Sequence, residues 1–260
     1  MPLVIGKDAG TLEKVKQIDN YYGFQNGITG KKLFLEGIKQ AENLDIEIVS
    51  DEVTNIIYDG NFTVVTRNFE YKSKTIVLAT GSSRKAPKIK GIKELEGKGV
   101  SYCAVCDAFF YRNKNVAVLG EGDYALAEVE HLLPIAKKVT LITDGKEPVQ
   151  NRSLEVDINE KKIKEVRGID AVDSVVFEDE TNLETDGLFI AIGTASSTDL
   201  ARKLGAVIKE NNVEVDENMM TNVPGLFAAG DCTGGILQIS KAIYEGTKAG
   251  LSIKKYLSKN

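Results

Sequence analysis

The 260-residue sequence contains few of the residues that build disulfide scaffolds or metal sites, with three cysteines and one histidine. Three cysteines are too few for a disulfide-stabilised scaffold in a chain of this length. No apolar run approaches the ~18 residues that a membrane-spanning helix needs. The segment Met1–Gly6 is apolar but too short, and lacks the basic flank of a secretory signal. These absences predict a cytoplasmic chain without a membrane span.

Charge of one sign is not concentrated anywhere in the sequence. The 33 basic and 38 acidic residues are interspersed along the chain and leave a net charge of −5 at pH 7. This pattern argues against a nucleic-acid-binding surface and gives no basic patch for a membrane. Hydrophobic residues make up 42% of the chain, which is enough for the core of one large or two modest domains.

Two of the three cysteines lie close together in the stretch Ser101–Phe110, as Cys103 and Cys106, and Asp107 follows directly. Thiols at this spacing can close a small disulfide ring, and each lowers the pKa of the other when a turn or helix start holds them together. An adjacent carboxylate could move a proton to or from the leaving sulfur. The stretch therefore predicts redox chemistry.

The same spacing also forms half of a zinc site, which needs two more ligands. The sequence offers Cys232 and His131. Both are distant from the pair, and their surroundings indicate a small packed cysteine and a partly packed helical histidine. A zinc-stabilised domain thus remains an alternative to the redox site.

A strand, a glycine turn, a helix and a second strand follow one another over residues 116–143. The turn has the pattern Gly120-x-Gly122-x-x-Ala125. A right-handed crossover of this kind places a helix N-terminus over a bound pyrophosphate. A tight turn without a ligand is the alternative. A binder of a 2′-phosphate would also need arginines after the second strand, where the sequence has Asp144–Pro148.

Two further apolar runs each end in a polar, glycine-containing pair. The run 75–79, which predicts a strand buried on both faces, leads to Thr80-Gly81, and the run 226–229 leads to Gly230-Asp231. Open α/β sheets hold ligands at the carboxyl ends of their strands. A helix cap is the alternative role of Asp231, since a long helix is predicted over 238–257.

Other patterns predict elements of the fold that carry no candidate site residue. A hairpin is expected at 62–71, strands at 154–156 and 213–216, and a meander over 163–177. Between residues 82 and 99 the composition changes to Lys, Pro and Gly, which predicts a linker at a domain boundary.

Taken together, four motifs resemble, in order and near spacing, those of the low-molecular-weight thioredoxin reductases. The motifs are Ala79-Thr80-Gly81, Cys103-Ala-Val-Cys106-Asp107, Gly120-Glu-Gly-Asp-Tyr-Ala125 and Ala228-Ala-Gly-Asp231. The resemblance implies an α/β fold of two doubly wound Rossmann-like domains, the second inserted in the first. An FAD-binding domain would comprise residues 1–90 and 218–260. A pyridine-nucleotide-like domain, carrying the cysteines, would comprise residues 91–217.

The resemblance also implies a role for each motif residue. Cys106 would stand next to the flavin, Cys103 would attack the disulfide of a thioredoxin-like partner, and Asp107 would act as acid and base. Electrons would come from NADPH or ferredoxin, and a homodimer is expected. The residues expected near FAD are Asn20, Tyr22, Gly23, Val53, Thr80, Gly81, Gly230, Asp231 and Gln238. Those expected at a pyridine nucleotide are Gly120, Gly122 and Ala125.

Three departures from the family pattern accompany this resemblance. The family's opening strand, Gly-x-Gly-x-x-Gly turn and helix are missing, which amounts to about 35 residues of one dinucleotide-binding half. The arginine cluster for the NADP 2′-phosphate is also missing, and the interval 146–186 is short and lacks the expected helix. The last two departures resemble the ferredoxin-linked flavin thioredoxin reductases of anaerobes. The first keeps open a second hypothesis, a truncated, FAD-deficient binding module without activity.

Overall fold

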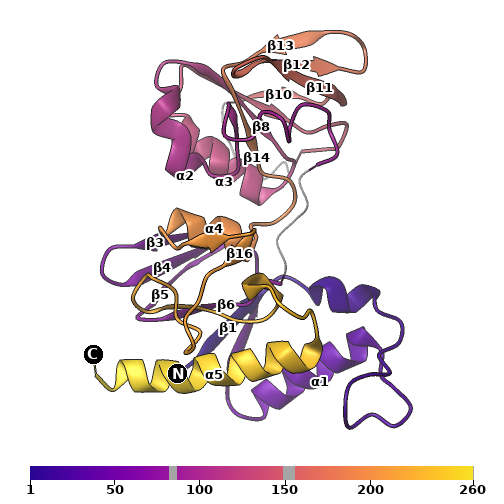
Figure 1. Cartoon of the computed structure of the whole chain (residues 1–260), viewed down its shortest axis with the longest axis vertical. Coiled ribbons are helices and arrows are strands. Elements are labelled where there is room, and N and C mark those ends of the chain that lie inside the picture. The colour runs from indigo at the N-terminus through magenta and orange to yellow at the C-terminus, as the bar shows by residue number, and fades with distance from the viewer. Residues whose placement is uncertain (82–86, 149–155, 260) are drawn as a thin grey trace. The chain divides into compact units, whose positions relative to one another are not determined.

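The computed structural model describes residues 1–81, 87–148 and 156–259 (Figure 1). Its α/β fold divides into two compact units. Unit 1 comprises Met1–Ser82 and Val207–Asn260, and unit 2 comprises Ser83–Ala206. The second unit is therefore inserted in the chain of the first, as the sequence predicts.

A five-stranded sheet in the order β10-β9-β8-β14-β7 forms the centre of unit 2. All four strand pairs in this sheet are parallel. Its strands are β7 (Val100–Ser101), β8 (Asn115–Leu119), β9 (Lys138–Ile142), β10 (Asp157–Asn159) and β14 (Gly187–Ile190). β8 and β14 are almost wholly buried. Continuous burial is expected for central strands of a parallel sheet, whose two faces are both covered.

The helical segments in the described part of unit 2 are α2 (Ala104–Asp107), η2 (Ala108–Tyr111), α3 (Asp123–Leu132) and α4 (Ser197–Lys203). α3 follows β8 and precedes β9, which confirms the predicted strand, glycine turn, helix and strand. α4 begins with a capping box, in which Ser196 and Asp199 bond each other's backbone N–H groups.

An antiparallel meander completes unit 2 and confirms the strands expected near 163–177. It is formed by β11 (Ile163–Gly168), β12 (Val172–Phe177) and β13 (Asn182–Glu184). Its apolar side chains pack with the parallel sheet and with Ile92 and Leu95 in one core. Because these two residues and Ile89 join this core, unit 2 begins before residue 91, where the sequence placed the boundary.

The described residues of unit 1 form four small sheets and four helical segments. Its parallel pairs join β1 (Leu3–Gly6) to β2 (Glu47–Ser50) and β6 (Ile76–Leu78) to β17 (Leu226–Ala228). The antiparallel sheets are β3-β4-β5 (Val53–Tyr58, Phe62–Thr66, Glu70–Ser73) and β15-β16 (Ile208–Lys209, Asn212–Val213). The helical segments are η1 (Gly10–Lys14), α1 (Gly30–Glu42), η3 (Asp231–Thr233) and α5 (Ile239–Leu257).

The C-terminal helix α5 packs against β17 through a small core. Ala249 is fully buried and clusters with Phe227, and the rings of Phe227 and Tyr256 meet edge to face at 6.2 Å. The long helix predicted over 238–257 and the hairpin β4–β5 are both confirmed.

Several local predictions differ from the structure. Val77, in the middle of β6, is 38% exposed, so the prediction of a strand buried on both faces is wrong at this position. Only Leu78 is fully buried there, because β6 belongs to a two-stranded sheet. The strand expected at 213–216 is limited to Val213 in β16, which pairs with β15 inside unit 1. Because β15 and β16 both belong to unit 1, unit 2 ends at Ala206, whereas the inserted domain was expected to end at residue 217.

The charged interval after β9 contains strands and no helix within its described part, 146–148 and 156–186. The strand expected at 154–156 falls largely outside the described residues. The nearest described strand is β10, at Asp157–Asn159.

Candidate redox-active site

Cys103 and Cys106 are joined in a disulfide at the start of α2, with their Cα atoms 5.3 Å apart. Cys103 is the N-cap of this helix, and its Sγ accepts the Cys106 N–H at 3.2 Å. A helix start leaves backbone N–H groups without intrahelical partners, and here a sulfur accepts one of them. The turn therefore stabilises negative charge on Cys103 when the disulfide is reduced.

The two sulfurs differ in their access to solvent. The Cys103 side chain is buried, with 1% of its surface exposed, whereas Cys106 is exposed. The Cys106 Sγ lies 3.9 Å from the carbonyl oxygen of Arg202, at the end of α4. A second protein can thus reach Cys106 more readily than Cys103 in this arrangement.

Ser101 connects Asp107 to the backbone of the cysteine turn. Its buried hydroxyl donates to Asp107 Oδ2 at 2.7 Å and accepts the Cys103 N–H at 3.1 Å. The carboxylate is therefore held by a fixed side chain within the same turn. No role was predicted for Ser101, because a serine at a strand end carries no signal of its own.

Two tyrosines near the turn are held in their neutral form. Burial, with Glu96 nearby, raises the pKa of Tyr102 to about 12, although Arg202 acts in the opposite direction. Burial first, and then the carboxylates of Asp107 and Asp186, raise the pKa of Tyr111. Neither phenol therefore loses its proton near neutral pH.

The glycine turn before α3 has the close packing that its pattern predicts. A Cβ on Gly120 would lie 2.2 Å from the Ala191 carbonyl oxygen and 2.7 Å from the Ala125 Cβ. Gly122 is the N-cap of α3 and offers no side chain to its N–H groups. Glu121, between the two glycines, forms an ion pair with Lys146 at 2.5 Å. A carboxylate at this position disfavours a phosphate at the helix start.

In unit 1, the structure brings the two glycine-containing strand ends together. β6 and β17 are parallel strands that pair Leu78 with Ala228. The segments that follow these two strands therefore leave the sheet at the same edge. The Ala229 N–H bonds to the Leu78 carbonyl at 3.0 Å. Thr80-Gly81 and Gly230-Asp231 follow directly, at the edge where parallel sheets hold ligands.

Asn20 and Gln238, which are 218 positions apart, also meet in unit 1. The Asn20 amide donates to Gln238 Oε1 at 3.1 Å. Around this contact Tyr22, Ile236 and Leu237 expose 99%, 73% and 57% of their surface. Gly23 is also exposed and has a positive φ. Val53 begins β3, where it pairs with Thr66.

The structure contains a polar network after β17 that the sequence did not predict. Glu245 Oε2 accepts the Gly230 N–H and the Thr233 hydroxyl, each at 2.8 Å. Lys241 Nζ lies 3.0 Å from the same carboxylate oxygen and donates to the Gly230 carbonyl at 2.7 Å. The network fixes Gly230, whose φ of +88° favours glycine. Its signal in the sequence is an i, i+4 Lys–Glu pair on α5.

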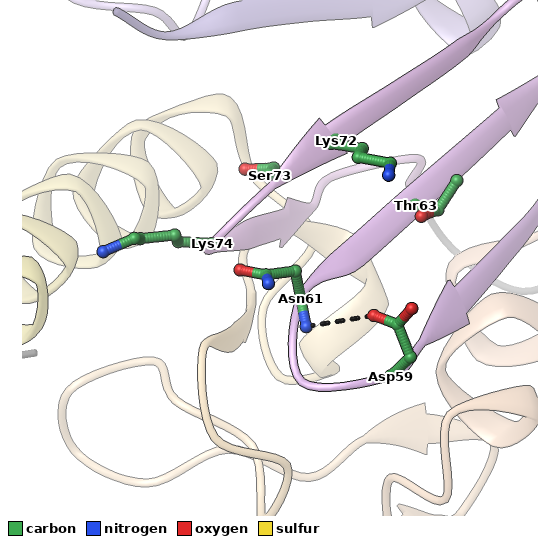
Figure 2. Close-up of a pocket in the computed structure, with 6 residues that line it drawn as sticks. All are labelled: Asp59, Asn61, Thr63, Lys72, Ser73 and Lys74. Carbon is green, nitrogen blue, oxygen red and sulfur yellow. Dashed lines mark hydrogen bonds between the residues drawn. The ribbon is translucent and has the colours of Figure 1, made fainter.

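A separate polar hollow lies on the β3–β5 sheet, and Figure 2 shows six residues that line it. Its lining is polar, and the Asn61 N–H bonds to Asp59 Oδ1 at 3.3 Å in the turn (Figure 2). The six lining residues, none of them a predicted site residue, are Asp59, Asn61, Thr63, Lys72, Ser73 and Lys74.

The described ranges 1–81, 87–148 and 156–259 hold no group of three or more His, Cys, Asp and Glu side chains arranged to bind a metal ion. Within them, no helix has the length and apolar character to cross a membrane.

Comparisons with known proteins agree with this geometry. Residues 7–246 match the family model described as pyridine nucleotide-disulphide oxidoreductase. A thioredoxin reductase of Aquifex aeolicus is 33% identical over 96% of this chain and 83% of its own length. One from Bacillus subtilis is 32% identical over 97% of this chain and 85% of its own.

Solved structures of thioredoxin reductases are also similar to this chain. The atypical thioredoxin reductase TRi from Desulfovibrio vulgaris Hildenborough has a TM-score of 0.93 and 39% identity, over 99% of this chain and 90% of that one. A ferredoxin-flavin thioredoxin reductase from Clostridium acetobutylicum has a TM-score of 0.70 and 29% identity, over 98% of this chain and 97% of that one.

Proposed function

We propose that this chain, which belongs to the thioredoxin reductases within the pyridine nucleotide-disulphide oxidoreductase family, passes electrons through Cys103 and Cys106 to the disulfide of a thioredoxin-like protein. The observation that carries the proposal is the Cys103–Cys106 disulfide at the start of α2, with Asp107 in the same turn. Similarity over nearly the whole chain does not favour the alternative of a binding module without activity.

The exchange uses one exposed and one buried sulfur. In the reduced protein, the Cys106 thiolate attacks one sulfur of the partner's disulfide, and the sulfur it displaces leaves as a thiolate that takes up a proton. The Cys103 thiolate then attacks Cys106, which restores the Cys103–Cys106 disulfide and releases the partner's second sulfur as a thiolate. Asp107, held by Ser101, supplies or removes the proton at the cysteine turn.

This assignment reverses the roles that the sequence resemblance implied. Cys103 was expected to attack the partner, but only 1% of its surface is exposed. Its Sγ also accepts the Cys106 N–H, which favours its thiolate as the group that resolves the mixed disulfide. The exposed Cys106 is the sulfur that a partner protein can approach.

The residues of unit 1 fit a flavin, and we assign FAD. The Asn20–Gln238 amide pair offers hydrogen bonds next to exposed apolar side chains, a combination that suits a planar heteroaromatic ring. Thr80-Gly81 and Gly230-Asp231 would hold the rest of the dinucleotide at the shared edge of β6 and β17. When bound, this group supplies the two electrons that reduce the Cys103–Cys106 disulfide.

Ferredoxin is the donor that the charges favour over NADPH. The residues after β9, Asp144–Pro148, provide no arginine for a 2′-phosphate. The Glu121 carboxylate also stands in the glycine turn, paired with Lys146, where a pyrophosphate would otherwise bind. By analogy with the family, the proposal includes a homodimeric protein in the cytoplasm.

Single cysteine variants test the assignment of the two sulfurs. Cys103→Ser leaves the exposed Cys106 without its resolving partner, so the reduced variant is expected to accumulate a mixed disulfide with oxidised thioredoxin. Cys106→Ser leaves only the buried thiol and is expected to trap at least tenfold less. Mass spectrometry under non-reducing conditions measures the adducts. Greater trapping by Cys106→Ser would return the attacking role to Cys103, and trapping by neither variant would contradict thiol exchange.

A further inference from the structure

A buried ion pair touches the redox-active turn from outside the cysteine motif. Glu128 on α3 and Lys203 at the end of α4 form this pair, and each side chain is 1% exposed. The second carboxylate oxygen of Glu128 accepts the N–H of Ala104, the first residue of α2, at 2.7 Å. The Lys203 Nζ also lies 5.1 Å from the centre of the Tyr124 ring. The pair therefore connects α3 and α4 to the start of α2, the redox helix, which carries the cysteine motif.

This arrangement needs an explanation, because burying two charges costs solvation that their mutual attraction often fails to recover. A neutral hydrogen-bond acceptor could satisfy the Ala104 N–H at lower cost. A carboxylate alone next to Cys103 would also oppose a thiolate there, since like charges disfavour each other's ionised form. Lys203 offsets this effect by cancelling the charge of Glu128.

The end of α4 approaches both halves of the cysteine motif. Lys203 reaches the start of α2 through Glu128, and the carbonyl of the preceding residue, Arg202, lies 3.9 Å from Cys106 Sγ. We propose that Glu128 and Lys203 are positioning residues for the redox helix: Glu128 holds its first N–H, and Lys203 cancels the carboxylate's charge beside Cys103. Both are distinct from Asp107, which acts on the sulfurs directly.

The inference builds on the dithiol role proposed above, but its test needs neither flavin nor an electron donor. A failure to reduce thioredoxin would leave the thiol titration of the chain measurable. Other ionisable groups around the turn stay the same in every variant. These are Tyr102 before α2, Asp107 on it, Tyr111 on η2, His131 on α3, and Asp199 and Arg202 at α4.

The first test compares the thiolate titration of the reduced full chain in three variants, followed by the ultraviolet absorbance of the thiolate. Glu128→Gln leaves the positive charge of Lys203 and is expected to lower the midpoint by about one pH unit. Lys203→Met leaves the negative charge of Glu128 and is expected to raise the midpoint of the titration by about one pH unit. The double variant is expected to return close to the parent. Cys103→Ser and Cys106→Ser identify the absorbing sulfur.

Opposite shifts are the result that a purely structural pair would not produce. If both single variants move the midpoint in the same direction, or either leaves it in place, Lys203 does not balance Glu128 at the thiol and the proposal fails. Thermal unfolding reports whether each variant is folded, because an unpaired buried charge is strongly destabilising.

A second comparison holds even if the single variants do not fold. Glu128→Gln/Lys203→Met and Glu128→Leu/Lys203→Met are both uncharged at this place, and only the first keeps an acceptor for Ala104. Protection of the Ala104 amide against hydrogen exchange is expected to fall by about tenfold in the Leu variant only. The equilibrium between the Cys103–Cys106 disulfide and glutathione is expected to move in that variant alone. Equal behaviour of the two doubles would overturn the positioning role.

Discussion

At the scale of single residues, the environment of His131 gives the protein a pH-dependent stability. Burial, followed by the nearby positive charge of Lys203, lowers the pKa of this imidazole in the folded chain. Glu128 and Glu130 act in the opposite direction but do not reverse the shift. The folded protein therefore binds fewer protons than the unfolded chain near the ordinary histidine pKa of 6.5.

Stability contributed by His131 is present above pH 6.5 and is lost as pH falls below it towards the folded pKa. His131→Gln should remove this dependence, and no other histidine in the chain can replace it. Urea unfolding of parent and variant between pH 8 and pH 5 checks the expectation. The stability of the parent relative to the variant should decline with acidification, since the carboxylates titrate in both. A constant difference would contradict the shift.

At the scale of elements, the strand–turn–helix unit of β8 and α3 depends on one glycine more than on the other. A side chain at Gly120 would meet the backbone oxygen of Ala191 at 2.2 Å, whereas the nearest atom at Gly122 is 3.4 Å away. Gly122 also has a φ of −104°, which alanine adopts without strain.

Gly120→Ala is therefore expected to destabilise unit 2 by about 2 kcal/mol or more, because β8, α3 and the chain after β14 must separate. Gly122→Ala serves as the matched control and should cost about 1 kcal/mol or less. Urea denaturation followed by circular dichroism measures both. Equal losses would mean that the close packing at Gly120 does not hold the turn.

Elements with a strong local pattern were predictable from the sequence, whereas side chains that act through tertiary contacts were not. The apolar run before Gly120 and the helical spacing after it indicated β8 and α3, and the Cys103–Cys106 spacing indicated the redox turn. Ser101, Glu128 and Lys203 became visible only when the fold brought 101, 107, 128 and 203 together. Of these three residues, only Glu128 had a signal in the sequence, because it is a charged residue within the apolar stretch of a predicted helix.

At the scale of the whole molecule, the chain divides its chemistry between two units. Unit 2 holds the cysteine turn and the ion pair behind it, and unit 1 holds the strand ends and the Asn20–Gln238 contact assigned to the flavin. The expected inserted domain, 91–217, differs from unit 2, Ser83–Ala206, where short segments join the core of one unit. Linker composition marks a boundary region, but tertiary packing decides the residue at which it falls.

We propose that electrons leave a bound flavin through Cys103 and Cys106. The most direct measurement loads the full chain with FAD, reduces it anaerobically with dithionite, removes the excess reductant and adds oxidised thioredoxin. The parent is expected to reduce thioredoxin stoichiometrically, as read from the thiols released. The Cys103→Ser/Cys106→Ser variant should take up and hold reduced flavin without passing electrons on. Thioredoxin reduction by that variant at the parental rate would contradict the claim, as would a parent that binds no flavin.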